Sequence, residues 1–74
     1  MDNDKYIVIE LQTLSGGGVA NIVTAHDTIN EAQSKYHGVL ASAAISAVPV
    51  HAAVLLDNHG MVLENYAFEH KTAV

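Results

Sequence analysis

Two hydrophobic periods follow one another along the chain, and they predict four strands and one helix. In residues 5–14, Ile7, Ile9 and Leu11 occupy every second position, and Tyr6 and Val8 lie between or before them. This period of two is typical of a β-strand. Three further short apolar segments, bounded by turn residues, predict the other strands: residues 19–26, 50–56 and 61–68.

A glycine-rich segment, residues 15–18 (Ser-Gly-Gly-Gly), separates the first two predicted strands. A phosphate-binding loop of this composition would be followed by a helix, whose N-terminus meets the anion, and by a lysine. Here a strand follows and the segment contains no lysine. Residues 15–18 are therefore predicted to form a hairpin turn, and residues 57–60 (Asp-Asn-His-Gly) a second turn.

In residues 28–48 the spacing of apolar residues changes to the period of a helix. Thr28 and Glu31 have the spacing of a capping box at its start, and Pro49 cannot continue it. Gly38 lies in mid-helix, where close packing or a slight bend would explain it, since glycine costs about 1 kcal/mol there. The stripe expected to cover a sheet is Ile29, Ala32, Tyr36, Leu40, Ala43 and Ala47.

The predicted order is therefore ββαββ in one small domain, residues 1–74. One helix on a four-stranded, mainly antiparallel sheet makes a two-layer α+β fold, with the helix packed on one face. If the helix crosses the sheet once, antiparallel pairing allows the spatial orders 2-1-3-4 and 1-2-4-3. The sequence does not choose between these two orders.

Self-association is expected from the composition. The chain has 74 residues, half of them hydrophobic, and no cysteine, so a disulfide cannot stabilise so small a domain. The second half of the predicted helix is apolar nearly all round, which a lone helix on a sheet cannot bury within one protomer. We predict a homodimer or higher oligomer with these interface residues: Val39, Ala41, Ser42, Ala44, Ile45 and Val48.

The charge balance excludes some partners. Eight acidic residues against three basic ones give a formal net charge of -5, which argues against direct nucleic-acid binding. The acidic N-terminus does not resemble a signal peptide, and no apolar run reaches the ~20 residues that span a bilayer. With cysteine absent, the expected location is the cytoplasm, without membrane attachment.

The only clustered polar chemistry lies in the predicted helix. Lys35, Tyr36 and His37 are consecutive, and with Lys5 they form a hypothetical site for a small anionic, nucleotide-like ligand between subunits. The five histidines lack the spacing of zinc ligands, so neither a metal site nor a cofactor is predicted. The carboxylates are scattered, and we predict no catalytic residues and no enzymatic activity.

Several segments resemble a group of very small proteins of bacteria and their phages to which no activity is assigned. They are residues 5–10, 21–25, 30–32 and 34–37, with the alanine-rich run that follows. The resemblance implies a phage or prophage accessory protein. The expected function is a non-enzymatic homo-oligomeric interaction module that engages a host protein; the alternative is an oligomeric binder that sequesters a small anionic ligand at subunit interfaces.

Overall fold

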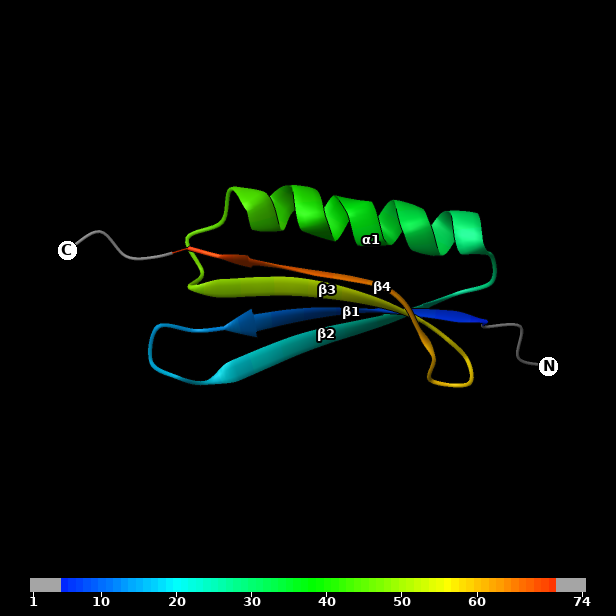
Figure 1. Ribbon diagram of the computed structural model, residues 1–74, viewed down its shortest axis with the longest axis horizontal. Helices are drawn as coiled ribbons and strands as arrows, with labels where there is room; N and C mark the ends of the chain where they lie inside the picture. Colours follow the sequence, from blue (N-terminus) through cyan, green and yellow to red (C-terminus); the bar gives the residue numbers. More distant parts are fainter. Residues whose placement is uncertain (1–4, 71–74) are drawn as a thin grey trace.

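The computed structural model describes residues 5–70, which form a four-stranded antiparallel sheet with one helix packed on one of its faces (Figure 1). The elements in chain order are β1 (Tyr6–Thr13), β2 (Val19–His26), α1 (Ile29–Ala44), β3 (Val50–Asp57) and β4 (Val62–Glu69). The predicted α+β class and ββαββ order are confirmed. Each strand end lies within one residue of the predicted position.

The strand order is β2-β1-β3-β4, the first of the two orders that the sequence allowed. β1 and β3 are the central strands and pair antiparallel from Tyr6↔Asp57 to Thr13↔Val50. The helix connects the edge strand β2 to β3, and it packs chiefly on the central strands β3 and β1. Residues of β1 and β3 that share a face of the sheet are therefore brought together although about 40 residues separate them in the chain.

Both predicted turns close hairpins. Gly17 has a φ of 92°, a left-handed value that favours glycine, and its N–H donates to the Leu14 carbonyl at 2.9 Å. In the second turn, Asp57 Oδ1 accepts hydrogen bonds from the backbone N–H groups of His59 (2.8 Å) and Met61 (2.9 Å). These two bonds hold the pKa of the Asp57 carboxyl below its ordinary value.

The helix begins as predicted but ends early. Thr28 is its N-cap, and the Thr28 hydroxyl accepts from the Glu31 N–H at 3.2 Å. The helix ends at Ala44, so the prediction that it continues to Val48 is wrong. The N–H groups of Ile45 and Ser46 bond back to the carbonyls three residues earlier, which tightens the last turn and lets the chain reverse before Pro49. Within residues 5–70, no helix is both long enough and apolar enough to cross a membrane.

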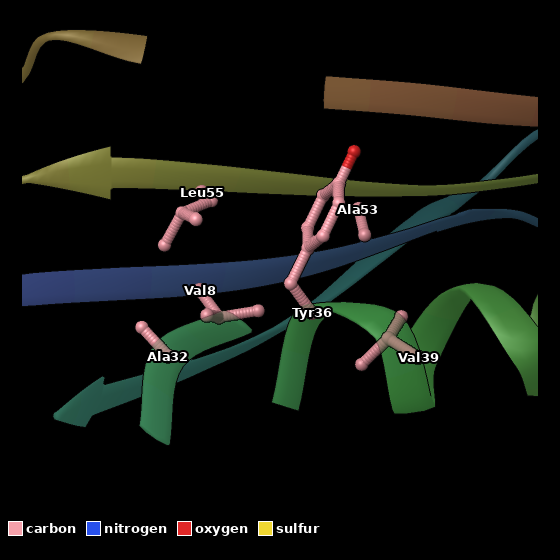
Figure 2. Close-up of a cluster of buried hydrophobic side chains, with 6 residues drawn as sticks. All are labelled: Val8, Ala32, Tyr36, Val39, Ala53 and Leu55. Carbon is pink, nitrogen blue, oxygen red and sulfur yellow. The ribbon is translucent and has the colours of Figure 1, made fainter. Parts of the chain in front are cut away.

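The core lies between α1 and the central strands. Figure 2 shows its buried side chains: Val8, Ala32, Tyr36, Val39, Ala53 and Leu55. The sheet-facing stripe of the helix runs through Ala32, Tyr36, Val39 and Ala43, with Leu40 half-buried at its margin. The expectation that Val39 faces away from the sheet is therefore wrong, because the 3.6-residue period places it, like Leu40, beside Tyr36.

Candidate functional site

Three polar side chains form a hydrogen-bonded chain beneath the C-terminal half of α1. Glu10 of β1 lies beside His51 of β3, with 2.6 Å between Glu10 Oε2 and His51 Nε2. His51 Nδ1 lies 2.9 Å from the hydroxyl of Ser46, which follows the helix. Three separate segments of the chain are thus joined through one imidazole, and this imidazole is buried, with 4% of His51 exposed.

The carboxylate fixes the direction of one of these bonds. Glu10 only accepts, so His51 donates from Nε2, and its other ring nitrogen, Nδ1, shares a hydrogen bond with the Ser46 hydroxyl. Gln12 Nε2 donates to the same oxygen, Glu10 Oε2, at 3.1 Å. The carboxylate is therefore held in one orientation by two donors on one of its oxygens.

Glu10 is ionised at neutral pH. Its burial disfavours the charged form, but the hydrogen bonds from His51 and Gln12, and the charges of His51 and Lys35, outweigh that effect. Together they hold the pKa of Glu10 below its ordinary value. The Glu10 side chain keeps 17% of its surface exposed.

This carboxylate opens onto a groove of about 370 Å³ between α1 and the sheet. The groove is lined by Glu10 from β1 and by one side of the helix: Ser34, Lys35, Gly38, Val39 and Ser42. Its volume lies at the lower end of the ~300–1,000 Å³ that small-molecule sites occupy. Both signs of charge and two hydroxyl groups are present on its walls.

Gly38 leaves one wall of the groove open. A Cβ atom built on Gly38 would meet no other atom within 4 Å. The expectation that Gly38 permits close packing is therefore wrong, since no neighbouring segment approaches it. Its effect in this fold is to leave space on the helix wall between Lys35 and Ser42.

Within one protomer, the residues predicted to bind an anion between subunits do not share one groove. Lys35 lines the groove, but Tyr36, His37 and Lys5 do not. Tyr36 is 3% exposed and belongs to the core, where burial, and then the charge of Glu64, raises the pKa of its phenol. His37 is exposed beside it, with 5.4 Å between the two ring centroids, and Lys5 is exposed at the start of β1.

A second surface of interest is the face of the sheet that α1 does not cover. Strand alternation places Val8, Ala53 and Leu55 under the helix, and their neighbours on the opposite side. We call that opposite side the open face. Its central residues are Ile7, Ile9, Leu11, Asn21, Val23, Ala25, Ala52, Val54, Leu56, Asn65 and Ala67. Most of these are apolar, and Val23 on the edge strand is 56% exposed. The one charged residue on this face within the described strands is Glu69, at the end of β4.

The predicted helix interface is only partly available for a partner. Val39 is buried within its own protomer, and Val48 lies beyond the helix and is half-buried. The exposed remainder is Ala41, Ser42, Ala44 and Ile45, of which Ile45 is 89% exposed. This remainder spans little more than one helical turn, about 7 Å of helix.

Sequence reasoning did not identify Glu10, His51 and Ser46 as a connected set. Glu10 was one of several scattered carboxylates, and His51 one of five histidines. The signal that could have found them is the period of two, which places Glu10 on the side of Val8, and His51 on the side of Ala53. Within residues 5–70, no group of three or more histidine, cysteine or acidic side chains is placed to hold a metal ion.

No family model, curated protein or solved structure matched this chain.

Proposed function

We propose that this protein is a non-enzymatic homo-oligomeric interaction module that self-associates through the open face of its sheet. The observation that carries the proposal is the apolar character of this face. Its centre, formed by alternate residues of β1 and β3, consists of Ile7, Ile9, Leu11, Ala52, Val54 and Leu56. A sheet face of this kind is normally covered by a second layer.

The size of the open face fits a second copy. Strands of eight residues at ~3.3 Å per residue are about 26 Å long, and four strands at ~4.8 Å spacing are about 19 Å wide. One face therefore offers about 500 Å², and two faces together reach the ~1,000 Å² expected of a specific interface. The exposed helix residues offer a far smaller area, because about 7 Å of a helix ~10 Å wide covers under ~100 Å².

Light scattering after size exclusion tests the interface with two matched charge substitutions. Val23→Lys places a charge on the open face, and Ile45→Lys places one on the helix end; both wild-type side chains are exposed. Wild type and Ile45→Lys should be dimeric or larger at micromolar concentration, and Val23→Lys should be monomeric. A monomeric wild type would contradict the proposal, and dissociation by Ile45→Lys alone would favour the helix interface.

We propose a non-enzymatic role although Ser46, His51 and Glu10 are the residue types of a hydrolase triad. A serine nucleophile needs N–H donors for the developing oxyanion. The N–H groups of Ile45 and Ser46 already bond to helix carbonyls, and the adjacent helix C-terminus has a negative partial charge. Ester substrates with nitrophenyl leaving groups should be hydrolysed no faster by wild type than by Ser46→Ala.

For the partner, we propose a host protein with a basic surface, met by the assembled module in the cytoplasm as a phage or prophage accessory protein. The support is the formal net charge of -5 and the exposure of acidic side chains such as Asp27 and Glu31. Association of this kind should weaken as ionic strength rises, because salt screens exposed charges.

The second candidate function is ligand binding beside Lys35, and the groove is the observation that favours it. The sequence predicted an anionic ligand bound between subunits by Lys35, Tyr36, His37 and Lys5. In the structure only Lys35 of these four lines the groove, and the carboxylate of Glu10 shares it. The groove therefore presents a negative as well as a positive charge to a ligand.

A further inference from the structure

The groove beside α1 contains one carboxylate with an unused acceptor. Both donors to Glu10, His51 and Gln12, bond to Oε2. Among residues 5–70, Oε1 accepts no side-chain hydrogen bond, and no buried side-chain oxygen or nitrogen there lacks a partner. Since Glu10 lines the groove, Oε1 is the carboxylate oxygen that remains to accept a hydrogen bond from a ligand.

Lys35 brings a positive charge to the same groove, but it does not form a salt bridge with the Glu10 carboxylate. Lys35 is close enough to lower the pKa of Glu10. Yet within the described part of the chain the only acid–base contact shorter than 4.0 Å joins Glu10 to His51, so the Lys35 ammonium group lies farther than 4.0 Å from the carboxylate. A space bounded by an ammonium group and a carboxylate complements a molecule that carries both charges.

The carboxylate is also held in place before any ligand arrives. His51 is buried and is itself bonded to Ser46, so the orientation of Glu10 is set by a second layer of polar contacts. A preorganised group loses less conformational entropy on binding than a mobile one. Gly38 meanwhile leaves the helix wall of the groove without a side chain.

We infer that this groove binds a small amino-acid-like zwitterion, whose ammonium group donates to Glu10 and whose carboxylate pairs with Lys35. The hydroxyl groups of Ser34 and Ser42, which line the same groove, are available to complete the hydrogen bonds of the ligand. The site belongs to one protomer, so this inference does not rest on the self-association proposed above.

A series of ω-amino acids tests the inference, because it varies the distance between the two charges. The probes are glycine, β-alanine, γ-aminobutyrate and ε-aminocaproate, each compared with the alkylamine and the carboxylate of matching length. Binding is followed by NMR titration of the backbone amides of Lys35, Gly38 and Ser42 at millimolar probe concentration. One chain length should bind best, and roughly tenfold or more tightly than its matched amine or carboxylate, since each charged hydrogen bond adds about 1.5 kcal/mol or more.

Three variants locate the site. Lys35→Met and Glu10→Gln each remove one charge, and Gly38→Leu fills the groove with a good helix-forming residue. Each should weaken binding of the preferred zwitterion by roughly tenfold or more. Lys35 and Gly38 are exposed, so their variants keep the test decisive if Glu10→Gln does not fold.

Several results would overturn the inference. They are the absence of any amide shift with the whole series, equally tight binding of the matched carboxylate, equally tight binding of the matched amine, and unchanged binding by Gly38→Leu. Each of these can be observed in the Val23→Lys variant, for which a monomer is expected, as well as in wild type. A failure of the ligand site is thereby distinguished from a failure of the proposed assembly.

Discussion

Glu10 connects the core to the groove, and its ionisation should make stability depend on pH. Its pKa is lowered in the folded protein, so the unfolded chain binds a proton at higher pH than the folded one. The stabilisation is complete above the ordinary value of 4.5 and is lost as pH falls through the lower folded-state pKa. Urea unfolding at fixed protein concentration should show wild type losing its advantage over Glu10→Gln in this acid range. Parallel curves for the two proteins would contradict the argument.

The same glycine-to-alanine substitution should have opposite effects at two positions. Gly38 lies in the helix with open space around its Cβ position, so Gly38→Ala should raise the free energy of unfolding by about 1 kcal/mol. Gly60 has a φ of 86°, which costs a residue with a side chain about 1–2 kcal/mol, so Gly60→Ala should lower the free energy of unfolding. Urea unfolding of both variants measures the difference, and a destabilised Gly38→Ala would show that the helix wall is more crowded than the structure indicates.

At the scale of elements, the cap at Thr28 determines where α1 begins. Thr28→Ala removes the acceptor of the Glu31 N–H and should lower the free energy of unfolding by about 1 kcal/mol. Thr28→Ser keeps the hydroxyl and should remain close to wild type. Circular dichroism and urea unfolding measure the loss, and equal stability of the two variants would mean that the cap contributes nothing.

Helix start and helix end differ in how far the sequence could predict them. The start is set by local chemistry, since Thr28 and Glu31 are three residues apart and mark it directly. The end is set by tertiary structure, because the apolar run continues while the chain has to reverse from Ala44 into β3. The strands were predictable for local reasons too: β1 from its period of two, and the other three from short apolar segments bounded by turn residues.

At the scale of the whole molecule, the groove could not be predicted because it depends on strand order. Glu10 and His51 meet only where β1 and β3 are neighbours. The alternative order allowed by the sequence, 1-2-4-3, would have separated those strands. Lys35 was recognised from its charge, but its proximity to Glu10 follows from how the helix lies across the sheet.

Self-association is the prediction that belongs to the whole molecule, and thermal stability should report it. If the open face is covered only in the oligomer, folding is coupled to association, and the Tm therefore rises with protein concentration. Wild type and Ile45→Lys should show this rise, whereas Val23→Lys should unfold at a lower Tm that does not change with dilution. Melting curves over a hundredfold range of concentration, roughly what mass action requires for a clear shift, provide the measurement. A wild-type Tm that is independent of concentration would mean that the protein is stable with its apolar open face in water. Self-association through this face would then be contradicted.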